Sequence, residues 1–314
     1  MKDQPNGAKQ VFIVMNPVSG VKDTGNSRKT IEEFCQSKGW QYEIHETQPD
    51  EDLRGLVGRQ VKQNVDMVLA GGGDGTVAAV VNGLVNSLVP LGILPLGTGN
   101  NLARDLGIPL GLPDALALLA APDNRLNELD VIQVGDAYYV LNVSIGVSAD
   151  TMHKTRREEK QKFGMLAYLR RGIESINRAD LYRFMVDVDG RKVRFRASEV
   201  MITNDKFMGL QPRLDGVDVE ANDGALDMFI VRASTLVDYL GVFRRFLIPA
   251  SQRDEEQLKH LPIRDMARIQ SDRPLRVQAD GEVIGQTPVE VRVVPNALRV
   301  IVPPAGRAAK AKSG

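Results

Sequence analysis

The chain has 314 residues, 43% of them hydrophobic and 25% charged, a composition typical of a globular protein with room for two hydrophobic cores. Forty Lys and Arg residues balance forty Asp and Glu residues, which argues against a general role in binding nucleic acid. The single Cys35 excludes an internal disulfide, the start MKDQPNGAKQ lacks a signal peptide's apolar core, and no stretch approaches the roughly 20 apolar residues of a spanning helix. We therefore expect a cytoplasmic protein whose membrane contact is peripheral.

The first third of the chain alternates short apolar runs with amphipathic segments, the pattern of a parallel sheet flanked by helices. Strands are predicted at Val11–Met15, Tyr42–Glu46, Val65–Ala70 and Leu91–Leu96. Helices are predicted at Asn26–Lys38, Pro49–Gln63, Thr76–Asn86, Asn101–Leu106 and Pro113–Ala120. These elements predict an α/β domain over residues 1–129.

From about Asp130 the sequence becomes rich in β-type runs that are separated by Asp-Gly and Gly-Asp turns. Such runs begin at Val131, Phe184, Gly224, Leu275 and Ala297. They predict a mostly antiparallel β-sandwich or barrel-like domain over residues 130–296. Two helical insertions are expected at Thr151–Arg178 and Leu236–Lys259, and a flexible tail at 304–314.

Three glycines, Gly71, Gly72 and Gly73, follow the third predicted strand and precede a helix. Without Cβ atoms this turn can approach a ligand closely, and its N–H groups, with those of the helix start, favour phosphate. Asp74 would repel phosphate, so it either holds Mg²⁺ with its water shell or accepts hydrogen bonds from the loop's own N–H groups. A strand-to-helix turn capped by Asp74, with no ligand, is the alternative.

Two further predicted strands end in polar turns with glycine. Gly97-Thr98-Gly99-Asn100-Asn101 follows the fourth strand, with Arg104 in the next helix, and Asn16-Pro17 follows the first strand, ahead of Ser19-Gly20. The carboxyl ends of parallel strands meet at one edge of a sheet, so the three turns can converge on one nucleotide. Neither GxxxxGK[ST] nor GxGxxG occurs at these turns, so the common phosphate-binding folds fit poorly.

Two motifs carry a resemblance to a known family. GGDGT at 72–76, with Asn82-Gly83 behind it, and LPLGTGNNLAR at 94–104 resemble the diacylglycerol kinase catalytic domain, and the resemblance extends from about Val11 to Pro303. The wider group includes bacterial soluble lipid kinases, sphingosine and ceramide kinases, and more distantly NAD kinases and phosphofructokinases. The resemblance implies ATP as phosphoryl donor, Mg²⁺ as cofactor, an NAD kinase-like α/β domain, and a last strand at 297–303 that returns to it.

The resemblance also implies roles for individual residues. Together with the turn pattern, it places ATP at Asn16, Gly71, Gly72, Gly73, Gly75, Thr76, Gly97, Thr98, Asn100 and Arg104. Asp280 and Glu282 match a DGE motif of the family, in which they would be the general base and a supporting carboxylate. Asp74 and Asp130 match carboxylates around the catalytic magnesium. Asp223 matches the ligand of a structural cation. Without the resemblance, Asp280-Gly281 and Asp223-Gly224 are ordinary turns.

A local excess of basic residues is hidden by the balanced total. Thr151–Val200 holds 13 Lys and Arg against 7 Asp and Glu, and Tyr239–Ala250 mixes arginines with aromatic residues. Basic helices of this kind suit an enzyme that docks transiently on the anionic inner face of a membrane and takes a lipid from it. Amphipathic helices that pack on the sandwich with solvated charged faces are the alternative.

These observations favour an ATP- and Mg²⁺-dependent lipid kinase that phosphorylates diacylglycerol to phosphatidic acid. Other acceptors remain open: phosphatidylglycerol, a sphingoid base, ceramide, or the soluble acceptor of an NAD kinase-like enzyme. The hypothesis outside enzymes is a nucleotide- or lipid-sensing regulator. A homodimer is as open as a monomer, and the three histidines have no metal-like spacing, so no zinc site is expected.

Overall fold

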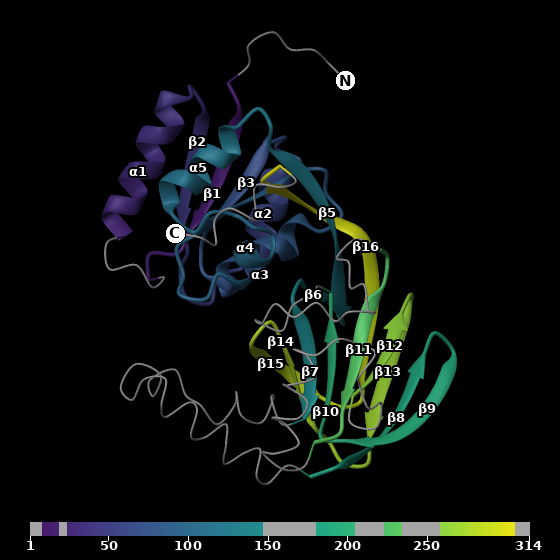
Figure 1. Ribbon diagram of the computed structural model, residues 1–314. Coiled ribbons are helices and arrows are strands. Elements are labelled where there is room, and N and C mark those ends of the chain that lie inside the picture. The colour runs from purple at the N-terminus through teal and green to yellow at the C-terminus, as the bar shows by residue number, and fades with distance from the viewer. Residues whose placement is uncertain (1–7, 19–23, 147–179, 205–222, 234–257, 305–314) are drawn as a thin grey trace. The chain divides into compact units, whose positions relative to one another are not determined.

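The computed structural model describes residues 8–18, 24–146, 180–204, 223–233 and 258–304 (Figure 1). The described chain forms two compact units, one running up to Leu129 and resuming at Asn296, the other spanning Asp130–Pro295. The expected helix at Thr151–Arg178 and most of the one at Leu236–Lys259 lie outside the described residues, as does the tail from 305. Leu258 and Lys259, predicted to end a helix, instead begin strand β12 (Leu258–Ile263).

The first unit is built on a parallel sheet. Its strands are ordered β2 (Gln41–Glu46), β1 (Gln10–Met15), β3 (Met67–Gly72) and β4 (Leu91–Pro95). Strands β3 and β4 are buried along their whole length, and β1 after its first residue, as expected for apolar runs that are covered on both faces. Met15 lies opposite Gly71, and Gly71 opposite Leu94, so the carboxyl ends of these strands are level.

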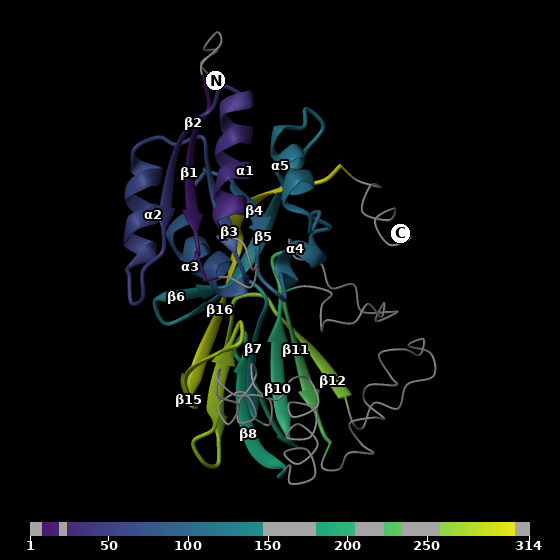
Figure 2. The ribbon, with the colours of Figure 1, turned by 90° about the vertical axis from the view of Figure 1, so that its left-hand side faces the viewer.

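Helices cover both faces of this sheet, and Figure 2 shows α1 (Thr24–Ser37) and α2 (Leu53–Lys62) on opposite sides. On the first face, Ile13 packs with Ile31 of α1 and Leu116 of α5 (Leu112–Ala120). On the second face, α2 lies against α3 (Asp74–Leu84), so closely that a Cβ on Gly83 would lie 2.6 Å from the Val57 Cβ. A short helix, α4 (Asn101–Asp105), follows β4.

The second unit contains two antiparallel sheets with a common core. One sheet has the order β12, β11 (Leu226–Val231), β10 (Glu199–Thr203), β7 (Asn142–Gly146), β14 (Arg276–Ala279) and β15 (Glu282–Gln286). The other contains β9 (Arg191–Ala197), β8 (Tyr182–Val188), β13 (Met266–Ser271) and the first part of β16 (Val289–Val302). Side chains from both sheets, such as Ile145 and Ile269, share one hydrophobic cluster. The predicted fold class, an α/β domain followed by a mostly antiparallel β domain, is therefore confirmed.

Strand β16 takes part in both units. Near its start, Arg292 pairs antiparallel with Met266 of β13, whereas near its end Val300 pairs parallel with Leu91 of β4. Strand β5 (Arg125–Val134) pairs with β16 and with β6 (Ala137–Tyr139). The first unit therefore takes its last strand from the C-terminal end of the described chain.

Candidate active site

The three polar turns of the first unit lie at the same edge of its sheet and are joined by hydrogen bonds. The Asn16 backbone N–H donates to the Gly71 carbonyl at 2.9 Å, and Asn16 Nδ2 donates to Thr76 Oγ1 at 3.4 Å. The Leu96 N–H donates to the Gly72 carbonyl at 3.0 Å. The exits of β1, β3 and β4 are thus one connected group of atoms, as the strand order predicts.

Glycine is needed in these turns because two loops touch. A Cβ on Gly97 would lie 2.4 Å from the Gly73 Cα, and a Cβ on Gly99 would lie 2.7 Å from Asp74 Oδ2. Gly72 is equally restricted, because its Cβ would meet Thr76 Oγ1 at 2.3 Å. Gly75, in contrast, has nothing within 4 Å of its Cβ position, so the first turn of α3 carries no side chain there and is open to a ligand.

Asp74 fixes the second loop against the first. Its Oδ1 accepts a hydrogen bond of 2.6 Å from the Asn101 backbone N–H, and its Oδ2 accepts one of 3.3 Å from Asn101 Nδ2. Asp74 thus fixes the neighbouring loop, whereas one of the two alternatives expected from the sequence was that it accepts from N–H groups of its own loop. Asp74 is also the first residue of α3, whose N-cap, Gly73, gives no side-chain hydrogen bond to the first helical N–H groups. Those N–H groups are therefore free of a side-chain cap, the situation that favours an anion.

Asn100 and Arg104 complete the loop after β4. Asn100 has a left-handed backbone with φ of 51° and is 8% exposed; its Oδ1 accepts from the Gly97 N–H at 3.0 Å and its Nδ2 donates to the Gly97 carbonyl at 2.8 Å. Its side chain therefore shapes the loop, while Thr98 at the tip is exposed. Arg104 is exposed and donates from Nε to the Gly99 carbonyl at 2.9 Å, a bond that does not use the two terminal NH₂ groups of its guanidinium.

The chemistry of this edge fits a magnesium-bound phosphate. The glycines leave room for a phosphate, and the uncapped helix N–H groups and Arg104 could bind its oxygens. Each carboxylate oxygen can accept more than one bond, so Asp74 can serve Asn101 and still hold Mg²⁺ or its waters. Among the described residues, no three His, Cys, Asp or Glu side chains form a ready metal cage.

In the second unit, Asp280 lies in the hairpin turn between β14 and β15. Its φ is 45° and that of Gly281 is 90°, so the turn that we considered as an alternative is present. The carboxylate holds the beginning of β7: Oδ1 accepts from the Leu141 and Asn142 N–H groups, both at 3.0 Å, and Oδ2 accepts from the Val140 N–H at 2.9 Å. The role of Asp280 as a general base stays a prediction.

Polar groups that the sequence analysis did not single out surround this turn. Gln278, which is 7% exposed, accepts a bond of 3.1 Å from the Gly281 N–H and donates to Ser144 Oγ at 2.8 Å. Burial raises the pKa of the Tyr139 hydroxyl, and the negative charges of Asp280 and exposed Glu282 raise it further. No signal in the sequence separates Gln278 from other polar strand residues, because its burial and its hydrogen bonds depend on tertiary packing.

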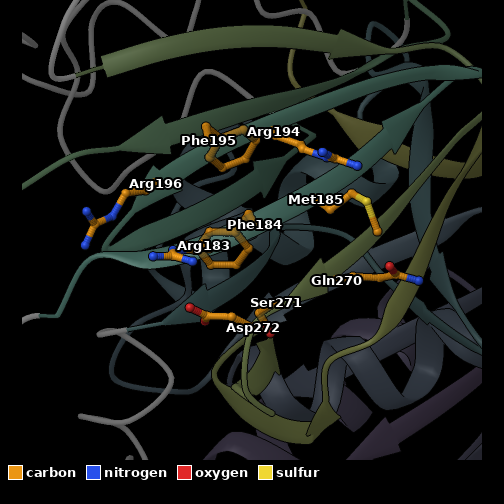
Figure 3. Close-up of a pocket in the computed structure, with 9 residues that line it drawn as sticks. All are labelled: Arg183, Phe184, Met185, Arg194, Phe195, Arg196, Gln270, Ser271 and Asp272. Atoms are coloured by element: carbon orange, nitrogen blue, oxygen red, sulfur yellow. The ribbon is translucent and has the colours of Figure 1, made fainter.

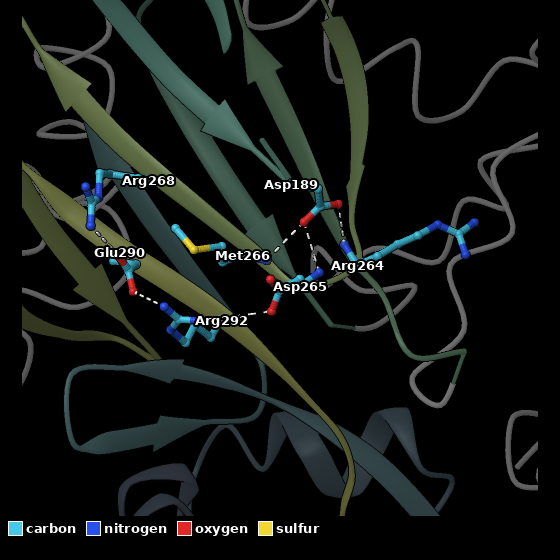
Figure 4. Close-up of polar contacts among 7 residues, drawn as sticks. All are labelled: Asp189, Arg264, Asp265, Met266, Arg268, Glu290 and Arg292. Atoms are coloured by element: carbon cyan, nitrogen blue, oxygen red, sulfur yellow. Dashed lines mark hydrogen bonds and ion pairs between the residues drawn. The ribbon is translucent and has the colours of Figure 1, made fainter. Parts of the chain in front are cut away.

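A second Asp-Gly turn, between β8 and β9, has the same contacts as the turn at Asp280. Asp189, with φ of 49°, accepts from the backbone N–H groups of Arg264 at 2.9 Å and of Asp265 and Met266 at 3.0 Å (Figure 4). Desolvation acts to raise the pKa of Asp189, but the three N–H bonds outweigh it and hold this pKa below its ordinary value. The contact pattern therefore serves hairpin structure as well as any chemistry at Asp280.

Asp130 and Asp223 meet at one loop of the second unit. Asp130 is fully buried, and its Oδ2 accepts a bond of 2.8 Å from the Gly224 N–H. Asp223 is exposed, and its Oδ1 accepts from the Ala225 N–H at 3.0 Å, which is a local turn. Asp74 belongs to the other unit. The metal-binding roles of all three carboxylates stay predictions.

Some predicted features fall outside the described chain. These are Ser19 and Gly20 of the first turn and the basic segments within 147–179 and 234–257. No helix within the described part has the length and hydropathy that crossing a bilayer requires.

Comparisons with known proteins cover both units. The model of the diacylglycerol kinase catalytic domain matches residues 10–134, and that of the YegS C-terminal NAD kinase beta sandwich-like domain matches residues 141–302. A Synechocystis relative named "Uncharacterized protein" is 28% identical over 94% of this chain and 70% of its own length. A Staphylococcus haemolyticus relative named "Putative lipid kinase" is 25% identical over 91% of this chain and 94% of its own length.

A solved structure supports the fold. It is described as "a putative diacylglycerol kinase from Bacillus anthracis str. Sterne", superposes with a TM-score of 0.77 at 23% identity, and covers 97% of this chain and 99% of its own. At that identity the likeness concerns the fold alone. The two matched domains show that the chain belongs to the family that joins a diacylglycerol kinase catalytic domain to a YegS-type C-terminal β-sandwich domain.

Proposed function

We propose that the protein is an ATP- and Mg²⁺-dependent lipid kinase that transfers the γ-phosphoryl group of ATP to the hydroxyl of diacylglycerol. The observation that carries this proposal is the connected glycine cradle at the exits of β1, β3 and β4, which Asp74 joins to Asn101. The family supports phosphoryl transfer, and the names of the Staphylococcus and Bacillus relatives support a lipid, specifically diacylglycerol, as acceptor.

At the donor end, the cradle would hold the phosphates of ATP. The first N–H groups of α3 and the guanidinium of Arg104 position and neutralise phosphate oxygens. Asp74 would hold Mg²⁺, which supplies neutralisation of the triphosphate charge when it is bound. Positioning and charge neutralisation are the main contributions that phosphoryl transfer requires of a protein.

At the acceptor end, Asp280 would take the proton of the lipid hydroxyl. The hydroxyl oxygen forms a bond to the γ-phosphorus while the bond from that phosphorus to the β–γ bridging oxygen breaks, so phosphatidic acid and ADP are formed. Three backbone N–H bonds hold the Asp280 carboxylate in one orientation, which suits a proton acceptor that must meet its substrate in fixed geometry. Glu282 would support it.

A labelling experiment tests this function. The protein is incubated with radiolabelled ATP, Mg²⁺ and a panel of diacylglycerol, phosphatidylglycerol, ceramide, sphingosine and NAD. We expect label in phosphatidic acid, no label when Mg²⁺ is chelated, and none with Asp280→Asn. Asp189→Asn is the matched control, since it makes the same change in the same kind of turn. Label confined to NADP would show an NAD kinase-like enzyme, and no label with any acceptor would refute the kinase.

A further inference from the structure

Strands β8 and β9 form a hairpin at the end of their sheet that is rich in basic side chains. Five of them are exposed: Arg183 on β8, and Arg191, Lys192, Arg194 and Arg196 on β9. In the strand order, β9 is the terminal strand and β8 is its neighbour. The hairpin therefore presents a concentrated positive charge at one edge of the second unit.

The register brings like charges face to face. Arg183 lies opposite Arg196, and Met185 lies opposite Arg194, so alternation places these four side chains on the outer surface of the hairpin. We call these four residues the basic face. Directly opposed like charges destabilise a strand pair unless something neutralises them. Within the described chain, none of the three arginines has an ion-pair partner. The described residues thus provide no carboxylate that pairs with these three arginines.

Arginines on the neighbouring strands form ion pairs, which makes the basic face distinct. Arg268 on β13 and Arg292 on β16 both pair with Glu290, at 2.8 and 2.7 Å (Figure 4). Arg273, after β13, pairs with Asp180 at 2.7 Å. Among the described residues, Arg268, Arg273 and Arg292 thus have carboxylate partners, whereas the three arginines of the basic face have none.

The basic face borders a hollow of about 470 Å³ (Figure 3). Besides the four residues of the face, Phe184, Phe195, Gln270, Ser271 and Asp272 line it. Met185 is 40% exposed, and the rings of Phe184 and Phe195 stack with centroids 5.6 Å apart. Guanidinium groups beside an exposed apolar side chain match the boundary of a bilayer, where anionic headgroups adjoin apolar chains.

Protection of an edge strand accounts for charge on β9 but not for the choice of arginine. Lysine is the charged residue that edge strands use most for this purpose, whereas three of the four charged side chains of β9 are arginines. On β9, all four charged side chains are basic. A surface of one sign selects its partner by charge complementarity.

We propose that the basic face of the β8–β9 hairpin docks on the surface of a bilayer that contains anionic phospholipids. Arg183, Arg194 and Arg196 bind the headgroups, and Met185 enters the boundary with the acyl chains. This proposal rests on the proposed function, because a lipid kinase must reach an acceptor that resides in a membrane. It places a docking surface on described strands, apart from the basic helices expected from the sequence.

Vesicle cosedimentation tests the docking surface. The full chain is mixed with vesicles of phosphatidylcholine alone or of phosphatidylcholine with phosphatidylglycerol. We expect binding only to the anionic vesicles, weakened by salt, and about 25-fold weaker for the Arg194→Gln, Arg196→Gln double variant, at about fivefold for each basic residue. Arg194→Lys with Arg196→Lys keeps the charge and should keep most of the binding.

The matched control removes the same charge from paired arginines. Arg268→Gln with Arg292→Gln should bind anionic vesicles as the wild type does, since two carboxylates already balance these two charges: Glu290 pairs with both arginines, and Asp265 lies 3.9 Å from Arg292. Equal loss in both Gln double variants, unchanged binding by the Arg194 and Arg196 variant, or tighter binding to duplex DNA than to the vesicles would overturn the proposal. Circular dichroism and Tm establish whether each variant is folded. If the Arg194→Gln, Arg196→Gln variant does not fold, the comparison of the Lys double variant with the wild type still tests the docking surface.

A separate measurement distinguishes this failure from failure of the proposed function. The wild-type protein is assayed with diacylglycerol in nonionic detergent micelles, where no anionic surface is needed. If no phosphoryl group is transferred to lipid in micelles but the vesicle binding is as expected, the kinase is refuted and the protein only binds lipid surfaces. Transfer in micelles, combined with binding that ignores Arg194 and Arg196, would refute the docking surface alone.

Discussion

Asp189 and Asp280 begin two hairpin turns that have the same contacts. Each is followed by glycine, each has a left-handed backbone, and each carboxylate accepts three backbone N–H bonds, two at Oδ1 and one at Oδ2. Each backbone N–H also donates at 3.0 Å, from Asp189 to Met266 and from Asp280 to Asn142. The chain thus contains an internal control for its own proposed catalytic residue.

The paired variants Asp280→Asn and Asp189→Asn separate structure from chemistry. In each, the remaining oxygen can keep two bonds, but the third N–H faces an amide, so each should lose about 1 to 2 kcal/mol of stability. Only Asp280→Asn should lose phosphoryl transfer. Denaturant unfolding and the labelling assay, both well below Tm, measure the two effects. Equal phosphoryl-transfer activity of the two variants would mean that Asp280 has no catalytic role.

The charge of Asp74 should matter more than its hydrogen bonds. In Asp74→Asn, an amide oxygen can still accept the Asn101 N–H, so stability should change by less than about 1 kcal/mol. Loss of the charge should weaken binding of Mg²⁺-ATP by about 10- to 100-fold, measured by calorimetric titration. Asn101→Ala removes only the 3.3 Å bond and should have a small effect. Equal weakening by both variants would mean that Asp74 only fixes the loop.

Gly97→Ala should separate the two loops of the cradle. The new Cβ would lie 2.4 Å from the Gly73 Cα, so backbone must move, at a cost of about 1 to 3 kcal/mol. The affinity for ATP should fall as well, because the moved backbone belongs to the proposed nucleotide site. Gly58→Ala is the control. Gly58 lies within α2 with nothing within 4 Å of its Cβ position, so this substitution should increase the free energy of unfolding by about 0.5 to 1 kcal/mol. An undisturbed Gly97→Ala protein would contradict the packing described here.

Cys35 should be protected from thiol reagents in the folded protein. It is fully buried, and burial raises the pKa of its thiol to about 11 from an ordinary value of 9.0. Reaction with an aromatic disulfide reagent at pH 8 should therefore follow unfolding. Because the unfolded thiol ionises first, stability should fall as pH rises from about 9 to about 11, and Cys35→Ala should lack this contribution. Rapid labelling of the folded protein would contradict it.

Much of the first unit could be predicted because its strands are continuous apolar runs that end at glycine. The helix expected at Thr76–Asn86 spans Asp74–Leu84, since Gly73 is its N-cap and glycines give little helical signal. Strand β13 was missed because only Ala267 and Ile269 of its six residues are buried, and they alternate with Arg268 and Gln270. Strand β12 was missed because its first residues were assigned to a helix.

Parts of the candidate site, too, could be predicted from the sequence, and others could not. Convergence of the turns could be predicted, since parallel strands end at one edge. The contact of Gly97 with Gly73 and the bonds of Asp280 to residues 138 to 140 positions earlier depend on tertiary packing, which leaves no local pattern. Gln278 looks like any polar strand residue until its neighbours are known.

Strand β16 restricts how this chain can be divided or recombined. A fragment ending at Leu129 would lack Val300, which pairs with Leu91, and the outer side of β4 would be bare. An engineered exchange of the nucleotide-binding half with that of a relative would therefore need to transfer the C-terminal strand as well. One sheet is thus encoded by two segments that lie far apart in the sequence, and these segments have to stay together in any recombination.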